Sequence, residues 1–263
     1  MSSKRWLVAF VTVLVLLVGS VGVAAITNGE PDDGRHPYVG LMMADDADGN
    51  PLWRCSGTLI SETIFLTAGH CTEAPAARAT IWFAEDVEAT PGFGTLAGYP
   101  FEGDVDGTPH THPDYDPSAF FLYDLGVVVL DEPVAMDEYG ELPRLGVLDG
   151  IKGNDKKAAL TAVGYGLQEI NPNRLAAELD RLVAPLDLIN TKGVFGVPRG
   201  TSIKVSGSGV GGDSSASGGT CFGDSGGPQF LADTNTVVAV TSFGLNGNCA
   251  GVGGGYRVDQ ADD

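Results

Sequence analysis

Short runs of β-branched and aromatic residues, separated by glycine-rich turns, fill the chain from Ile26 onward. The sequence holds 38 glycines in 263 residues, and helical spacing is scarce. Short runs bounded by turn residues are typical of antiparallel strands. We expect strands over residues 38–43, 52–60, 64–68, 80–84, 125–130, 159–163, 201–205 and 237–243. The pattern therefore predicts an all-β chain folded as a pair of domains.

Three stretches interrupt this pattern. Leucines recur at helical spacing between residues 175 and 186, but Pro185 and β-branched neighbours weaken a helix. Instead of one helix, residues 174–190 could equally hold a strand and a short helical turn. Residues 131–148, rich in Pro, Glu and Asp, separate two halves of similar length, and residues 207–219 form a low-complexity loop of Gly and Ser.

The first 25 residues have the composition of a secretory signal peptide. Lys4 and Arg5 precede an apolar run, and small residues end the segment at Ala25. A membrane anchor is the alternative, because the run approaches the roughly 20 residues that a spanning helix needs. Glycines interrupt the run near the expected cleavage site, so we expect cleavage after Ala25, secretion of residues 26–263, and no membrane attachment afterwards.

Acidic residues outnumber basic ones by a wide margin. The sequence has 34 Asp and Glu against 15 Lys and Arg, a formal net charge of −19. Such a surface repels nucleic acid and anionic membranes, and it favours solubility and basic partners. We therefore expect no nucleic-acid partner, and we expect a monomer.

The segment C-F-G-D-S-G-G-P, residues 221–228, offers a serine suited to covalent chemistry. A serine hydroxyl is a weak nucleophile, so acyl transfer on Ser225 needs a neighbouring base and donors aimed at the oxyanion. Gly223 can turn its N–H inward beside that of Ser225, while Gly226 and Gly227 leave room for a substrate. The alternative interpretation is an ordinary Gly-Ser turn.

The base for Ser225 should be a histidine, because imidazole titrates near neutral pH and can both take and return a proton. His70, in L-T-A-G-H-C, directly follows a predicted strand, whereas His36, His110 and His112 lie in loops rich in Pro and Asp. His110 and His112 could instead share one face and bind a metal. A third ligand at suitable spacing is missing, so we expect no metal site.

Three segments resemble those of the chymotrypsin-like (trypsin-family) serine proteases. C-F-G-D-S-G-G-P is similar to the family's nucleophile loop, L-T-A-G-H-C to its histidine motif, and D-L-G-V-V-V-L, opening at Asp124, to its aspartate segment. The resemblance implies a triad of Ser225, His70 and Asp124, in which the carboxylate orients the imidazole. Asp114 and Asp116 are the competing acids, although neither precedes a buried strand.

The resemblance also implies the architecture. Members of this family fold into two antiparallel six-stranded β-barrels with the active site in the cleft between them. We therefore expect residues 26–135 to form the first barrel, with the histidine and the aspartate. Residues 145–263 would form the second barrel, with the nucleophile and the specificity pocket.

Further roles follow from the resemblance. The amides of Gly223 and Ser225 would form the oxyanion hole. Asp224 would pair with the freed ammonium of Ile26, because I-T-N-G is similar to the family's Ile-Val-Gly-Gly N-terminus. Signal cleavage alone would then complete activation, without a propeptide. Family members end in a helix packed on the second barrel, and too few residues follow Val258 to form one.

Four cysteines in an exported chain predict two disulfides. Sequence alone allows three pairings, and a zinc site built from all four cysteines lacks close ligand spacing. We choose Cys55 with Cys71 and Cys221 with Cys249. Each bond then closes a loop of moderate length and clamps one of the proposed catalytic segments.

The specificity pocket is expected to be uncharged. Trypsin-type members carry an aspartate six residues before the nucleophile, where this chain has Gly219, although Asp213 could reach the pocket. S-F-G at residues 242–244 resembles the Ser-Trp-Gly strand that pairs with substrate backbone. The expected substrate-binding residues are Gly219, Thr220, Phe222, Ser242, Phe243, Gly244 and Gly254. We predict cleavage after large apolar residues such as Phe, Tyr or Leu.

Taken together, these features predict a secreted serine endopeptidase that needs no cofactor. It would hydrolyse protein or peptide substrates through an acyl-enzyme on Ser225, and it could be bound by protein protease inhibitors. Two alternatives remain open. The chain could be a non-catalytic binding protein that keeps the scaffold, or a secreted esterase.

Overall fold

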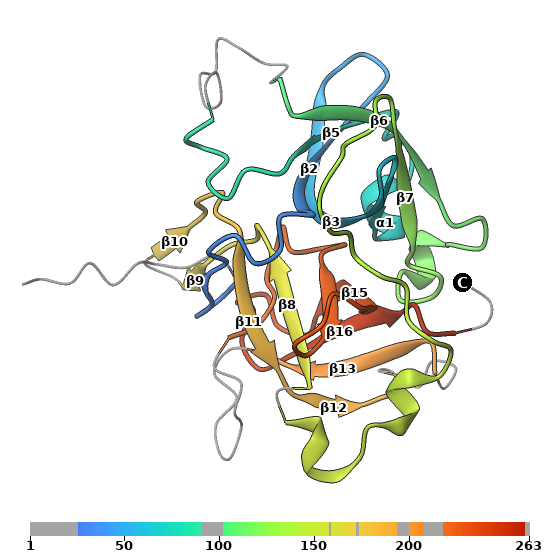
Figure 1. The fold of residues 1–263 in the computed structure, drawn as a ribbon, viewed down its shortest axis with the longest axis vertical. Helices are drawn as coiled ribbons and strands as arrows, with labels where there is room; N and C mark the ends of the chain where they lie inside the picture. Colours follow the sequence, from blue (N-terminus) through green and yellow to red (C-terminus); the bar gives the residue numbers. More distant parts are fainter. Residues whose placement is uncertain are drawn as a thin grey trace, which may run out of the picture.

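The computed structural model describes residues 26–90, 102–157, 159–171, 174–193, 200–207 and 218–260. The expected signal peptide, Asp213 and most of the 207–219 loop lie outside these ranges. Among the described residues, no helix is long and apolar enough to cross a membrane. Strands dominate these residues, as the all-β prediction requires (Figure 1).

The first half of the chain forms a closed barrel of six antiparallel strands. These are β2 (Val39–Asp45), β3 (Pro51–Ser61), β4 (Ile64–Thr67), β5 (Arg78–Trp82), β6 (Val105–Thr111) and β7 (Gly126–Leu130). They follow the order β2-β3-β4-β7-β6-β5, and β5 pairs with β2 to close the ring. Closure leaves no sheet edge with unpaired backbone groups.

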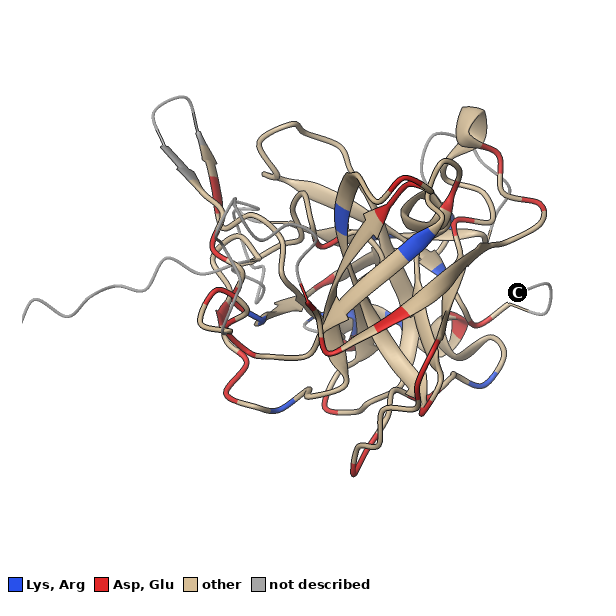
Figure 2. Ribbon diagram, turned by 90° about the horizontal axis from the view of Figure 1, so that it is seen from above, with Lys and Arg blue, Asp and Glu red and all other residues tan. Residues whose placement is uncertain are grey.

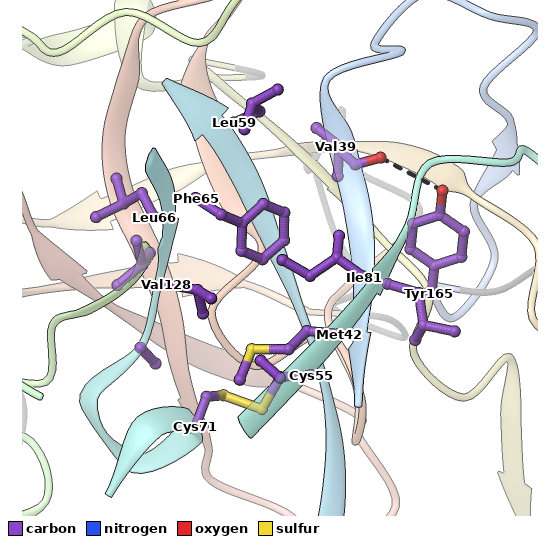
Figure 3. Close-up of a cluster of buried hydrophobic side chains, with 14 of the residues drawn as sticks. Val39, Met42, Cys55, Leu59, Phe65, Leu66, Cys71, Ile81, Val128 and Tyr165 are labelled. Carbon is purple, nitrogen blue, oxygen red and sulfur yellow. Dashed lines mark hydrogen bonds between the residues drawn. A yellow bond between two sulfur atoms is a disulfide. The ribbon is translucent and has the colours of Figure 1, made fainter. Parts of the chain in front are cut away.

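Apolar side chains from these strands fill the barrel (Figure 3). Phe65, Leu59 and Ile81 are fully buried. In β7, Val128 is buried whereas Val129 is 40% exposed, which is the alternation of a strand with one face on a core. Each large apolar side chain contributes roughly 1.5–3 kcal/mol through burial, so this core fixes the strand ends that carry the site residues.

The second half forms an antiparallel sheet of eight strands, curled into a half-barrel below the first barrel in Figure 1. The strands are β1 (Glu30–Pro31), β8 (Leu160–Gly164), β11 (Leu182–Leu186), β12 (Leu188–Asn190), β13 (Ser202–Ser206), β14 (Pro228–Leu231), β15 (Val237–Gly244) and β16 (Val252–Arg257). Their order is β1-β11-β8-β14-β15-β16-β13-β12. A closed barrel and a curled sheet together are consistent with the expected two-barrel fold.

All eight strands expected from the sequence are present, with ends that differ by a few residues. Residues 174–190 form strands, so the helical interpretation of this stretch is wrong. They contribute β10 (Arg174–Ala176), β11 and β12, and β10 forms a hairpin with β9 (Glu169–Asn171). Helix in the described residues is limited to short turns: α1 (Gly69–Thr72), η1 (Pro117–Ala119), η2 (Val147–Gly150) and η3 (Gly153–Lys156).

A buried polar network joins the two halves. Arg181, directly before β11, donates to the carboxylate of Asp32 at 2.9 Å and to the carbonyl oxygens of Val39 and Phe83 at 3.2 and 2.9 Å. The hydroxyl of Tyr165 also donates to the carbonyl of Val39, at 3.3 Å (Figure 3). The cation and the anion are both nearly inaccessible to water, so each depends on the other for stabilisation.

Candidate active site

Pairing of β4 with β7 brings the proposed histidine and aspartate together. Thr67, the last residue of β4, lies opposite Gly126, the first residue of β7. His70 follows in α1, and Asp124 lies two residues before the start of β7. The Nδ1 atom of His70 lies 3.0 and 3.1 Å from the two carboxylate oxygens of Asp124, and its backbone N–H donates to Oδ1 at 2.9 Å.

The environment of this pair favours a charged imidazole. Asp124 is completely buried, whereas the His70 side chain is 26% exposed. Burial by itself lowers the pKa of His70, but the hydrogen bond and charge of Asp124, with the charge of Glu73, outweigh it and leave this pKa raised. Such a histidine can take a proton and hold it while a carboxylate steadies the resulting cation.

Ser242 has a contact that the sequence analysis did not foresee. We expected it only in the substrate-binding strand, but its hydroxyl donates to Oδ2 of Asp124. The carboxylate thus receives donors from the His70 ring, the His70 backbone and Ser242. These bonds satisfy a buried charge and fix the orientation of the carboxylate toward the imidazole.

The loop that carries Ser225 is shaped by two glycines with positive φ. Gly223 has φ 97° and Gly226 has φ 77°. A Cβ atom on Gly226 would lie 2.0 Å from Oγ1 of Thr67 in β4. We expected Gly226 to make room for a substrate, but the structure shows that it lets the loop press against the first barrel. The carbonyl of Ser225 also accepts from the Ser56 N–H at 2.8 Å.

The two amides proposed for the oxyanion hole have no internal acceptor. Within the described residues, the N–H groups of Gly223 and Ser225 donate to no other protein group. Backbone donors without a partner are rare unless water or a ligand satisfies them. This leaves both groups able to bind the negative oxygen of a tetrahedral intermediate.

Ser225 and His70 border two hollows that meet between them. The first has a volume of about 440 Å³, and its lining also includes residues of β15 and of the turn that follows it. The other, about 570 Å³, lies over the Cys55 side of β3 and also includes Leu167. The ring of His70 makes its hydrogen bonds to Asp124, and none to Ser225 is present in the described residues. Such contacts often tighten only when substrate binds.

The first of these hollows, which we term the acyl-side hollow, contains five of the seven expected substrate-binding residues. Its lining includes Thr220, Phe222, Ser242, Phe243 and Gly244. Among all of its described lining residues, none is Asp, Glu, Lys or Arg. The hollow therefore offers an uncharged surface beside Ser225.

Gly219 and Gly254 lie elsewhere. The N–H of Gly219 donates to the carbonyl of Thr27 at 3.0 Å, which ties this residue to the N-terminal segment. The ring of Phe243 covers Gly254, where a Cβ atom would lie 2.2 Å from the ring. Neither glycine belongs to the lining of the acyl-side hollow in this structure.

Ile26 and Asp224 are both buried but are not joined in the described residues. The Ile26 side chain belongs to the core of the second half. Oδ1 and Oδ2 of Asp224 accept from the N–H groups of Gly166 and Cys221, each at 2.8 Å. Burial raises the pKa of Asp224 to about 7, although these two bonds and the charge of Arg54 favour the anion. This carboxyl is therefore a buried acid with no contacting cation among the residues that the structure describes.

The four cysteines are joined in the pairing that the sequence analysis chose. Cys55 is bonded to Cys71, and Cys221 to Cys249. The first bond links β3 to the short helix of His70 (Figure 3). The second anchors the start of the nucleophile loop to the turn after β15. Each disulfide thus restrains one segment of the candidate site.

The competing candidates have other contacts. His36 bonds through Nδ1 to Asp32, and His112 stacks on Tyr123. Asp116 accepts from the Ser118 N–H at the start of η1. Of the acids and histidines weighed from the sequence, His70 and Asp124 are the pair that the structure places beside the nucleophile loop.

Comparison with known proteins adds the family. The model of the family described as Trypsin matches residues 26–261. The chain belongs to the trypsin family of serine proteases. Chymotrypsin from Phaedon cochleariae is 29% identical over 213 residues, covering 79% of this chain and 68% of that protein. Serine protease 1 from Drosophila melanogaster is 29% identical over 243 residues, covering 85% and 77%.

Solved structures share this trypsin-family fold at lower identity. The structure titled HL collagenase has a TM-score of 0.66 at 22% identity, covering 89% of this chain and 94% of that one. Human heparin binding protein has a TM-score of 0.62 at 18% identity, covering 89% and 92%. These similarities support the two-barrel architecture and carry no information about substrates.

Besides the Ser242 contact, two further site features escaped the sequence analysis. Gly166 holds Asp224 through its N–H, and Arg54 packs against Gly223, with Nε 3.1 Å from where a Cβ of Gly223 would lie. The G-Y-G triplet after the strand at residues 160–164 was a visible signal for the first. No sequence pattern indicates that Arg54 lies at the site, because its contact with Gly223 forms only when β3 packs against the nucleophile loop.

Proposed function

We propose that this chain is a serine endopeptidase that hydrolyses peptide bonds through an acyl-enzyme on Ser225. The observation that carries the proposal is the hydrogen bond between the buried Asp124 carboxylate and His70. The His70 side chain in turn lines both hollows together with Ser225. Membership of the trypsin family supports the same chemistry.

In the proposed mechanism, Oγ of Ser225 attacks the scissile carbonyl and its proton passes to Nε2 of His70. Asp124 stabilises the imidazolium, and the N–H groups of Gly223 and Ser225 bind the oxyanion. His70 then returns the proton to the leaving amine as the C–N bond breaks. A water, deprotonated by His70, attacks the acyl-enzyme and restores Ser225.

We propose that the acyl-side hollow receives a large apolar side chain before the scissile bond. The support is its lining, which includes Phe243 and Leu245 and, among the described residues, no ionised Asp, Glu, Lys or Arg. An Arg or Lys side chain would lose its hydration there without gaining a counter-ion. Phe, Tyr or Leu would gain from burial instead.

We also propose secretion, with cleavage after Ala25 and pairing of the new Ile26 ammonium with Asp224. The support is the composition of the first 25 residues, two disulfides, and the buried Asp224 carboxyl without a contacting cation. The domain limits 26–135 and 145–263 remain part of this proposal. N-terminal sequencing of exported protein checks it, because a start other than Ile26 contradicts it.

The test of the enzyme proposal is intact mass after treatment with a serine-directed fluorophosphonate. Wild type should gain one adduct, and Ser225→Ala should gain none. Hydrolysis of internally quenched peptides then distinguishes an endopeptidase from an esterase, which would cleave only ester analogues. Absence of an adduct on a chain that begins at Ile26 would favour a non-catalytic binding protein.

A further inference from the structure

The second hollow at the candidate site contains an arginine without a hydrogen-bond partner. Arg54, half-buried in β3, lines this hollow together with His70, Ser225 and Gly223. Within the described residues, no group accepts a hydrogen bond from its guanidinium, and no carboxylate lies within ion-pair distance of it. An arginine presents five donors in a fixed fork, so this side chain has unused capacity for an anion.

The position of Arg54 relative to the reacting atoms is set by packing. A Cβ atom at Gly223 would lie 3.1 Å from Nε of Arg54, so the guanidinium rests directly on the residue whose N–H is proposed to bind the oxyanion. The carbonyl of Gly223 is fixed by the hydroxyl of Ser56, two residues along β3 from Arg54. The arginine is therefore held beside the scissile bond by the same strand that supports the nucleophile loop.

A peptide bound with its scissile bond at Ser225 would extend into both hollows, one on each side of that bond. The acyl-side hollow contains the β15 residues that would pair with the backbone before the scissile bond. The Arg54 hollow lies on the other side of Ser225 and His70, over β3, and so would hold the residues after that bond. We term it the leaving-group hollow.

The electrostatic balance of the leaving-group hollow favours an anion at Arg54. Burial lowers the pKa of the guanidinium, and the charges of Asp224 and Glu88 only partly offset this effect. Asp224 is already engaged by two backbone N–H groups. The hollow has one opposing anion, Glu73, which interacts with His70.

We propose that Arg54 selects substrates carrying Asp or Glu at the first or second residue after the scissile bond. The inference rests on the proposed endopeptidase function and adds a specificity residue to it. The bound carboxylate would receive charge-assisted hydrogen bonds from the guanidinium. Selection would be local, since the rest of the surface is rich in acidic residues (Figure 2).

The test uses internally quenched peptides that share one apolar residue before the scissile bond. They differ only at the first or second residue after it, which is Glu, Gln or Lys. On wild type, we expect kcat/KM for the Glu peptide to exceed that for the Gln peptide by about 5- to 20-fold at one of these positions. A difference of this size is expected from one charge-assisted hydrogen bond that solvent partly screens. The ratio should shrink in 0.5 M NaCl, since salt screens exposed charges.

Variants assign this preference to Arg54. Arg54→Gln should reduce the Glu-to-Gln ratio to about one or below, and Arg54→Lys should retain part of it, because a lysine keeps the charge but not the fork. Arg35→Gln is the matched control: it also removes one positive charge, but from an exposed pair with Glu30, and it should keep the wild-type ratio.

The outcomes separate the two proposals. Equal rates for Glu and Gln on wild type, faster cleavage with Lys, or a preference that survives Arg54→Gln would overturn the selection by Arg54 while leaving the endopeptidase intact. Failure to cleave every peptide, together with failure to react with the fluorophosphonate, would overturn the enzyme proposal and the inference that rests on it.

Discussion

Asp124 illustrates how one residue can depend on partners from distant parts of the chain. Its carboxylate is fully buried and receives donors from His70, 54 residues before it, and Ser242, 118 residues after it. Several donors satisfy the acceptor oxygens of a buried carboxylate and hold it in one orientation. The orientation of the Asp124 carboxylate toward the histidine therefore depends on both halves of the chain.

Replacing that carboxylate tests the proposed triad. Asp124→Asn should lower kcat/KM by about 1,000- to 10,000-fold, because the neutral amide cannot stabilise the imidazolium and favours the wrong tautomer of His70. Asp114→Asn, a matched change at the competing acid, should stay within about twofold of wild type, as surface substitutions usually do. Initial rates on a peptide substrate measure both, and equal effects would exclude Asp124 from the triad.

Asp224 provides a prediction about pH. Burial raises its pKa in the folded chain to about 7, above the 3.8 of an ordinary aspartate, so the folded state binds an extra proton between these two values. The free energy of unfolding should therefore fall as pH rises from about 4 through about 7. This applies to a Ser225→Ala chain with one residue added before Ile26. Asp224→Asn should flatten the dependence, and Asp233→Asn, on an exposed turn, should not.

A chain that begins at Ile26 should behave differently. If the free ammonium pairs with Asp224, the carboxylate gains a partner and its pKa falls, so the loss of stability toward neutral pH should disappear. Urea denaturation across this pH range measures both chains. Identical profiles for the extended chain and the chain starting at Ile26 would contradict the proposed pair.

At the scale of elements, the sequence identified strands best where local pattern and burial agree. The β-branched strand 126–130 alternates as expected. In contrast, β16 was missed because V-G-G-G-Y-R has little strand propensity, and its burial comes from β13 and β15 on either side. The motifs identified His70 and Ser225, but they could not reveal Arg54, whose surroundings exist only after β3 packs on the nucleophile loop.

The contact between that loop and the first barrel can be tested at Gly226. Gly34 has a similar φ, 73°, but a Cβ there meets nothing within 4 Å, whereas at Gly226 it would lie 2.0 Å from Thr67. Gly34→Ala should cost about 1–2 kcal/mol, the usual penalty for a left-handed residue. Gly226→Ala should cost about 1–3 kcal/mol more than this, because the added methyl group overlaps Thr67 and the packed strands must shift to admit it.

Guanidinium denaturation of the two glycine variants, in a Ser225→Ala background, measures this difference. Failure of Gly226→Ala to fold under conditions in which Gly34→Ala folds also agrees with the prediction. Equal stabilities would show that the loop can withdraw from β3 and β4 without cost, and would remove the structural reason for this glycine.

For the whole molecule, the candidate site exists only where the two halves meet. His70 and Asp124 belong to the first barrel, while Ser225 and Ser242 come from the second half. Any substitution that weakens the contact between the halves should therefore lower both the activity and the free energy of unfolding. Outside the site, Arg181 links the halves by donating to the carbonyl oxygens of Val39 and Phe83 in the first half. Its charge is paired with Asp32 beside β1, and the two side chains are 3% and 0% exposed.

Removing this link should destabilise the molecule as a unit. Arg181→Met removes the guanidinium that pairs with the buried Asp32 carboxylate, so it should cost about 3–5 kcal/mol. Arg78→Met breaks an exposed pair with Asp106 and should cost less than about 1 kcal/mol. Denaturant midpoints measure both, and parallel loss of fluorophosphonate labelling in Arg181→Met would show that the halves must stay docked for Ser225 to react. A cost within 1 kcal/mol of the Arg78 variant would instead mean that the backbone contacts between the halves suffice.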